Sequence, residues 1–348
     1  MRWDNLSLDG DDDREAAALP LIEKGAVTRT FDTPDFKDMT FYEVRARSVL
    51  NRVPAGPGMP AGWTLNPYRG CTHACVYCFA RNSHRYLDLD PGRDFDTRVV
   101  VKVNAPEVVR REIAARGRPG DHVAMGTNVD CYQRAEGRYR LMPGILAALR
   151  DYRVSFSVLT KGTLILRDLP LLQQAAERAR VETAVSVGFT DPALWRALEP
   201  GTPSPQARLE VCRKLNEAGV PCAVLMSPIV PYLSDSPDQL RATVQAVARS
   251  GAVSIAPEVM YLRPGSREWF MRWLGEHHPG LVGRYRALYG DAVQAPRWYR
   301  QRVLDQVWKL AEEYGCRPPQ TFHTGRPPNW SAPPPPPENP GPTQQALF

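Results

Sequence analysis

The stretch NPYRGCTHACVYCFAR, residues 66–81, gathers three of the seven cysteines of the chain within eight positions, at Cys71, Cys75 and Cys78. Thiolate groups placed in this way bind either zinc or an iron–sulfur cluster. A structural zinc ion takes four ligands, so a zinc site here would need His73 or His84 as the fourth. In a [4Fe–4S] cluster, three thiolates would hold three irons and leave one iron open to another ligand. The spacing therefore indicates a metal centre and leaves both kinds open.

The composition is that of a globular protein with a moderate excess of basic residues. The 348 residues are enough for a single α/β barrel with additional segments at both ends. The formal net charge of +6 gives weak support for a polyanionic partner such as a nucleic acid. No apolar run reaches the ~18 residues of a membrane span, and the acidic N-terminal residues lack the apolar segment of a secretory signal. We therefore expect a cytoplasmic protein with no membrane partner, whose cysteines are reduced thiols or metal ligands.

Short apolar strands alternate with amphipathic helices over most of the chain. The pattern predicts six strands, at residues 63–68, 122–127, 154–161, 181–189, 220–230 and 252–262. Helices are predicted at residues 105–116, 139–152, 169–180, 204–219 and 236–251, and an additional strand at residues 97–103. This alternation is typical of parallel βαβ units. Six strands are too few to close an eight-stranded barrel, so an open or partial α/β barrel is expected.

The two ends of the chain differ from this central pattern. Residues 1–50 are predicted to form an N-terminal arm with a short strand near Phe41–Val44, and residues 60–262 the barrel core. Residues 263–325 are predicted to form a cap of two aromatic-rich helices that covers the open side of the barrel. The Pro-rich residues 326–348 cannot build a core and are expected to be a disordered tail.

The spacing CxxxCxxC followed by an aromatic residue, Phe79, resembles that of the radical S-adenosylmethionine (SAM) superfamily. The segments RGCTHACVYCFAR, MGTNVDCYQRAEGRYRL and VLTKG are together similar to the branch of spore photoproduct lyase, over about residues 60–290. The resemblance implies a partial (βα)6 radical SAM barrel with C-terminal covering helices, and a [4Fe–4S] cluster bound by Cys71, Cys75 and Cys78. It implies that SAM binds the open iron and is cleaved reductively to a 5′-deoxyadenosyl radical, which abstracts hydrogen from the substrate. A reducing protein such as flavodoxin or ferredoxin would supply the electron.

The same resemblance assigns cofactor contacts to residues at the ends of three predicted strands. Gly126, Thr127 and Asn128 stand where the family accepts hydrogen bonds from the amino group of SAM. Lys161 matches the lysine that pairs with the SAM carboxylate, and Ser186 matches a serine near that carboxylate or the ribose. The alternatives are an ordinary capped loop, a solvated lysine and a strand serine that is bonded to the backbone.

Cys131 and Tyr132 follow the strand predicted at residues 122–127. In spore photoproduct lyase a cysteine near the end of this strand returns hydrogen to the product radical, so Cys131 is a candidate hydrogen donor. It falls a few residues later than the donor of that family. Tyr132 and Tyr77 are candidate radical relays. The alternative for Cys131 is a small, semi-buried thiol with no chemistry.

These observations lead to one enzyme class and leave its substrate open. The first hypothesis is a radical SAM enzyme that acts on nucleic acid in a lyase or repair reaction, which the resemblance and the positive charge support. The second is a radical SAM enzyme that modifies a peptide, a tRNA or a small molecule, because a fold does not determine a substrate. A third, non-enzymatic hypothesis is a zinc-stabilised nucleic-acid-binding protein.

Overall fold

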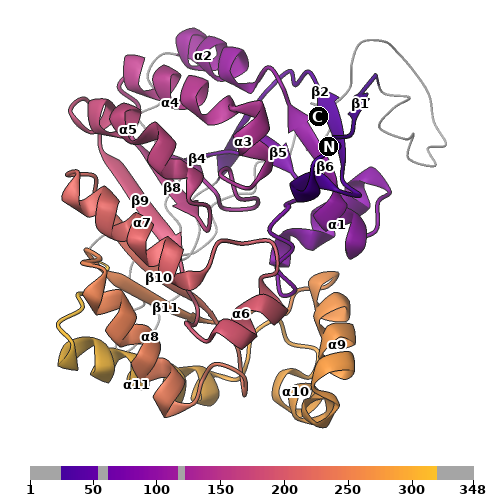
Figure 1. Ribbon diagram of the computed structural model, residues 1–348, viewed down its shortest axis with the longest axis vertical. Coiled ribbons are helices and arrows are strands. Elements are labelled where there is room, and N and C mark those ends of the chain that lie inside the picture. The colour runs from indigo at the N-terminus through magenta and orange to yellow at the C-terminus, as the bar shows by residue number, and fades with distance from the viewer. Residues whose placement is uncertain (1–24, 54–61, 117–121, 320–348) are drawn as a thin grey trace, which may run out of the picture.

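A seven-stranded sheet forms the centre of the computed structural model, which describes residues 25–53, 62–116 and 122–319 (Figure 1). Its strands are β3 (Leu50–Val53), β4 (Gly62–Leu65), β7 (Val123–Met125), β8 (Phe156–Thr160), β9 (Val181–Ser186), β10 (Cys222–Ile229) and β11 (Ile255–Val259). They follow the order β11-β10-β9-β8-β7-β4-β3 across the sheet. All neighbours from β4 to β11 are parallel, and β3 runs antiparallel to β4. The six parallel strands confirm the partial (βα)6 barrel predicted from the sequence.

Helices cover the outer face of this sheet (Figure 1). The helices between β6 (Arg98–Lys102) and β11 are α2 (Ala105–Arg116), α3 (Ala135–Tyr139), α4 (Leu141–Asp151), α5 (Leu169–Ala176), α6 (Pro192–Leu198), α7 (Pro205–Glu217) and α8 (Pro237–Arg249), and the short helices α3 and α6 are not part of this outer layer (Figure 1). Ser204 and Ser236 precede the prolines that begin α7 and α8, and each serine hydroxyl accepts a backbone N–H of the first turn. The helix predicted at residues 139–152 begins later, because Arg140 takes a left-handed conformation with φ of 50° and separates α3 from α4.

A second, four-stranded sheet lies beside the first and corrects the prediction for the N-terminal arm. Its strands are β1 (Val27–Arg29), β2 (Thr40–Val44), β5 (Tyr68–Arg69) and β6 (Arg98–Lys102), in the order β1-β2-β6-β5. The strand predicted near Phe41–Val44 is therefore β2, but it belongs to a sheet rather than to an arm. Its parallel partner β6 comes more than 50 residues later in the chain. A pairing over this distance produces no periodic pattern in the local sequence. Residues 1–24 lie outside the described residues.

The C-terminal cap contains three α-helices where the sequence predicted two. They are α9 (Ser266–His277), α10 (Val282–Tyr289) and α11 (Arg297–Glu313), and the 3-10 helix η5 (Pro279–Leu281) joins the first two. The predicted first helix is interrupted because Pro279 lacks the N–H that would continue it. The helix α11 packs against α8 and β11. Residues 326–348, the predicted tail, lie outside the described residues.

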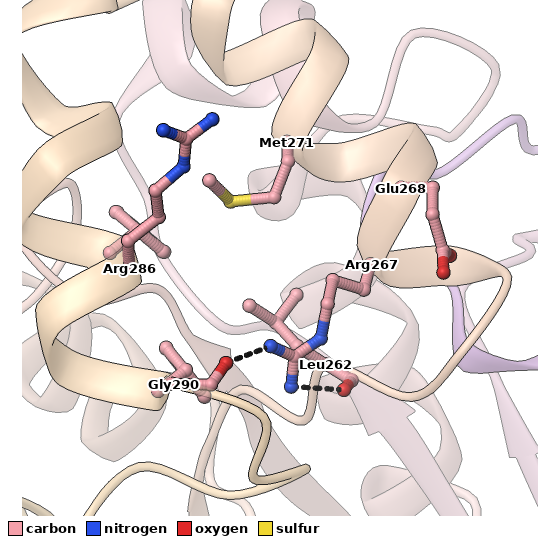
Figure 2. Close-up of a pocket in the computed structure, with 8 residues that line it drawn as sticks. Leu262, Arg267, Glu268, Met271, Arg286 and Gly290 are labelled. Atoms are coloured by element: carbon pink, nitrogen blue, oxygen red, sulfur yellow. Dashed lines mark hydrogen bonds between the residues drawn. The ribbon is translucent and has the colours of Figure 1, made fainter.

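The cap also covers the outer edge of β11. The N–H of Ile255 donates to the carbonyl of Arg317 at 2.9 Å, and the N–H of Leu262 donates to the carbonyl of Val293 at 2.8 Å. A cavity of about 250 Å³ lies between α9 and α10 (Figure 2). Within it the Arg267 guanidinium donates to the carbonyls of Gly290 and Leu262, so this arginine braces the loop that follows α10.

None of the helices in the described part of the chain combines the length and the hydropathy needed to cross a lipid bilayer.

Glu112 ties the start of β3 to α2, and its removal should destabilise the protein. The buried Glu112 carboxylate accepts the backbone N–H groups of Val49 at 2.9 Å and Leu50 at 3.1 Å, and the Ser48 hydroxyl. We expect Glu112→Ala to lower the free energy of unfolding by about 2–3 kcal/mol, since buried donors lose a charged acceptor. Urea unfolding followed by circular dichroism measures this change. The matched control is Glu107→Ala at an exposed position of the same helix, and an equal loss in both variants would contradict the prediction.

Candidate metal centre and cofactor site

The loop that carries the three cysteines runs from β5 to the 3-10 helix η3 (Phe79–Leu87). Neighbouring elements hold its backbone at several points. The N–H of Cys71 donates to the carbonyl of Phe95 in α1 (Arg93–Thr97) at 2.9 Å, and the N–H of Val76 donates to the carbonyl of Leu198 in α6 at 2.9 Å. Ala74 takes a left-handed conformation with φ of 53°. The loop is therefore a fixed turn rather than a free segment.

The three thiols of this loop lie in surroundings that oppose a negative charge. Cys71 and Cys75 are buried, and Cys78 is half-buried. Burial raises the pKa of all three thiols, to about 12 for Cys75, and the neighbouring cysteines raise the pKa of Cys71 further. Three thiolates would therefore require a bound cation, and coordination to a metal deprotonates a thiol. This donor set fits a [4Fe–4S] cluster, in which each cysteine binds a different iron.

The two histidines considered as zinc ligands have other partners. The Nδ1 atom of His73 lies 3.3 Å from the Oδ2 atom of Asp130, and the Nε2 atom of His84 lies 2.9 Å from the carbonyl oxygen of Arg98. Burial lowers the pKa of His84 to about 4. Within the described ranges, no three His, Cys, Asp or Glu side chains are grouped so that they could hold one metal ion.

Asp130 joins the cysteine loop to the end of β8, and it is not among the site residues predicted from the sequence. Its carboxylate accepts the Thr160 hydroxyl at 2.7 Å and the backbone N–H of Lys161 at 2.6 Å, both at the end of β8. It also faces His73 of the cysteine loop at 3.3 Å. Burial would raise the pKa of Asp130, but His73 and these hydrogen bonds lower it to about 2. The only sequence signal was an acidic residue soon after a buried strand.

Lys161 and Ser186, predicted from different strand ends, are in direct contact. The Lys161 ammonium donates to the Ser186 hydroxyl at 2.8 Å, and this hydroxyl donates to the carbonyl of Ser227 at 2.8 Å. The ammonium also lies 5.9 Å from the centre of the Tyr77 ring. Burial raises the pKa of Cys75 and Lys161 opposes this effect, so the lysine charge is directed at the cysteine loop.

A buried ion pair that the sequence did not reveal supports this contact. Arg208 of α7 pairs with Glu199, which follows α6, and donates to the carbonyl of Ser186 at 2.7 Å. The Tyr77 hydroxyl donates to the same Glu199 carboxylate. Burial would raise the pKa of Glu199, but Arg208 and Lys161 hold it below its usual range. Tyr77, a candidate relay, is therefore a fixed hydrogen-bond donor between the loop and the barrel.

Gly126, Thr127 and Asn128 lie at the carboxyl end of β7, as predicted. Gly126 has φ of 84°, and a Cβ atom there would lie 1.8 Å from the carbonyl oxygen of Leu159. Thr127 is half-buried and Asn128 is exposed. The close approach of β8 thus requires glycine at position 126, while the two polar side chains lie at the open end of the barrel. Their contact with SAM stays a prediction.

Cys131 and Tyr132 lie deeper in the molecule than the preceding three residues. Cys131 is fully buried, and burial, Asp130 and Glu136 raise the pKa of its thiol. The Tyr132 hydroxyl donates to Asp168 at 3.1 Å, in the 3-10 helix η4 (Leu164–Asp168). The burial of Cys131 agrees with the alternative of a packed thiol. Its role as hydrogen donor and the relay role of Tyr132 stay predictions.

Comparison with known proteins gives a family match and several relatives. The profile of the Radical SAM superfamily matches residues 65–245. An uncharacterized protein of Mycobacterium tuberculosis is 45% identical over 310 residues, which cover 87% of this chain and 91% of the relative. An uncharacterized protein of Methanocaldococcus jannaschii is 29% identical over 56% of this chain and 69% of its own length.

Solved structures of spore photoproduct lyase share the fold. A mutant with bound AdoMet and dinucleoside spore photoproduct aligns with a TM-score of 0.57 at 14% identity, over 76% of each chain. The enzyme complexed with dinucleoside spore photoproduct aligns with a TM-score of 0.57 at 15% identity, over 79% of each chain. At these identities the likeness concerns the fold.

Gly126→Ala should destabilise the protein far more than the same change at another glycine with positive φ. Gly219 has φ of 79° but open space around the position of a Cβ atom, so Gly219→Ala should cost only the backbone strain of about 1–2 kcal/mol. Gly126→Ala adds a clash with the backbone of β8 and should exceed this cost or prevent folding. Urea unfolding of both variants measures the difference. Similar losses in the two variants would show that β7 and β8 are not so close.

Proposed function

The chain belongs to the radical SAM superfamily, and we propose that Cys71, Cys75 and Cys78 hold a [4Fe–4S] cluster with SAM bound beside it. When bound, the cluster supplies the electron that cleaves SAM to a 5′-deoxyadenosyl radical for hydrogen abstraction from the substrate. A reducing protein such as flavodoxin or ferredoxin would deliver that electron. The remaining residues of the site bind and orient SAM and shield the thiolates from water.

The observation that carries the proposal is the contact between Lys161 and Ser186 next to the cysteine loop. The Lys161 ammonium is a compact positive charge 2.8 Å from the Ser186 hydroxyl, and such a pair can bind a carboxylate. Arg208 holds the backbone of Ser186 in place. The carboxyl end of β7 at Gly126 offers carbonyl groups for an ammonium group. Together these groups match the two charged ends of the methionine part of SAM.

We further propose that the substrate is a nucleic acid, processed in a lyase or repair reaction. Residues 263–302 contain eight arginines and three acidic residues, which makes this part of the cap strongly basic. The Arg263 guanidinium lies 5.2 Å from the centre of the Phe79 ring, so the basic segment adjoins the cysteine loop. A basic surface of this kind suits a phosphate backbone. Spore photoproduct lyase, which shares the fold, has been solved with a dinucleoside spore photoproduct.

Anaerobic reconstitution tests the cofactor part of the proposal. The protein should bind about four irons per chain and absorb broadly in the visible region. Alanine in place of any of Cys71, Cys75 and Cys78 should abolish the absorbance and the formation of 5′-deoxyadenosine with dithionite and SAM. A colourless protein with one tightly bound zinc would instead support the zinc-stabilised binding protein.

Lys161→Met should separate SAM binding from cluster binding. We expect the variant to keep its iron, because Lys161 is not a ligand, and to bind SAM at least ~10-fold more weakly, a loss of about 1.4 kcal/mol. Equilibrium binding of SAM to the oxidised, reconstituted protein measures the change. Lys214→Met, at a solvent-exposed position of α7, is the matched control and should bind SAM normally. Unchanged affinity in Lys161→Met would refute the assigned carboxylate contact.

Deuterium transfer tests the substrate class. DNA that contains deuterated thymine dimers should transfer deuterium to 5′-deoxyadenosine under anaerobic turnover with dithionite. The control is the same reaction with undamaged, equally deuterated DNA. If SAM is cleaved but no label from DNA reaches 5′-deoxyadenosine, the repair proposal fails. The modification of a peptide, a tRNA or a small molecule then becomes the better hypothesis, and assays with deuterated candidates of these classes would follow.

A further inference from the structure

Arg81 is a buried cation directly behind the cysteine loop. It follows Cys78 by three residues in η3, and its side chain is fully buried. Its guanidinium donates to the carbonyl of Cys75 through Nε at 3.1 Å and Nη2 at 2.9 Å, and to the carbonyl of Gly92 through Nη1 at 2.7 Å. Arg81 therefore contacts the backbone of a cluster ligand rather than solvent.

One acidic side chain is paired with this cation. The Nη2 atom of Arg81 donates to both carboxylate oxygens of Asp96, at 2.8 and 3.0 Å. The guanidinium also lies 5.2 Å from the centre of the Phe95 ring and 5.1 Å from the centre of the Trp269 ring, which belongs to α9. Arg81 is fully buried and Asp96 is mostly buried, so their charges are screened less than they would be in solvent.

The two charges have opposite signs and lie at different removes from the cysteine loop. Arg81 contacts the backbone of Cys75 directly, and Asp96 is joined to that contact through Arg81. A neutral donor would be enough to hold the Cys75 carbonyl, and a buried ion pair is a costly way to stabilise a loop. The arrangement is better explained by an effect of the charges on the metal centre.

We propose that the Arg81–Asp96 pair sets the reduction potential of the cluster held by Cys71, Cys75 and Cys78. This inference rests on the proposed function. Reduction adds one electron from an external reductant to the cluster, and no covalent bond forms or breaks. Arg81 favours the added negative charge and raises the potential, whereas Asp96 lowers it, because net charge near the sulfurs is one determinant of cluster potentials. Both are positioning residues, since neither ligates iron.

Redox titration of the reconstituted, full-length protein, followed by the electron paramagnetic resonance signal of the reduced cluster, tests this inference. The titration is run at pH 8 so that Asp96 stays ionised, since burial raises its pKa to about 6. At a fixed potential, Arg81→Met should lower the ratio of reduced to oxidised cluster at least ~10-fold, which is about 59 mV for one electron. Asp96→Asn should shift the ratio in the opposite direction. Arg81→Lys, which keeps the charge, should recover most of the loss.

The matched control is Arg85→Met, which removes an exposed arginine from the same 3-10 helix and should leave the ratio unchanged. Shifts of Arg81→Met and Asp96→Asn in the same direction, or no shift relative to Arg85→Met, would overturn the inference, because a merely structural brace loosens the loop in both variants. If Arg81→Met does not retain iron, Asp96→Asn decides: a rise in the reduced fraction supports the inference, and no change or a fall overturns it. A wild-type protein that binds no cluster would instead refute the proposed function, which iron analysis shows before any titration.

Discussion

The constraint on which the structure depends is the burial of three thiols in one turn. Burial raises the pKa of Cys71, Cys75 and Cys78, so their anionic forms are disfavoured unless a cation is bound. Lys161 opposes the raised pKa of Cys75, but it is not the only group that acts on this turn. The protein fixes the turn from several sides, through Asp130 and His73, through the Glu199–Arg208 pair, and through Arg81. These contacts fix the shape of the loop, which suits a group that needs fixed ligands.

The parallel topology explains why residues far apart in sequence meet at this turn. The carboxyl ends of β7, β8 and β9 lie side by side at one end of the sheet, as in other α/β folds. Each end contributes a different group: a glycine that lets strands approach at Gly126, an ammonium at Lys161 and a hydroxyl at Ser186. The ammonium and the hydroxyl are in contact next to the cysteine loop, although they are 25 positions apart in sequence.

The sequence predicted the parts of the molecule that follow from local pattern. The helices predicted at residues 204–219 and 236–251 begin with N-caps at Ser204 and Ser236, whereas the metal centre inferred from the cysteine spacing stays a prediction. The sequence did not predict contacts that depend on tertiary folding. Tyr77 and Glu199 are separated by 122 positions, and the strands of the second sheet are too short to show periodicity. Asp130 could not be singled out from the sequence, because its partners Thr160, Lys161 and His73 come together only in the folded chain.

The segments that flank α11 bond to backbone groups at the edge of the sheet formed by β11. An unpaired strand edge offers N–H and C=O groups to any other extended chain, and such edges promote aggregation. Here the N–H groups of Ile255 and Leu262 are bonded to the segments that flank α11. The backbone of the cap therefore accepts hydrogen bonds from these two N–H groups. The six-stranded barrel can therefore stay unclosed without offering these two N–H groups to another chain.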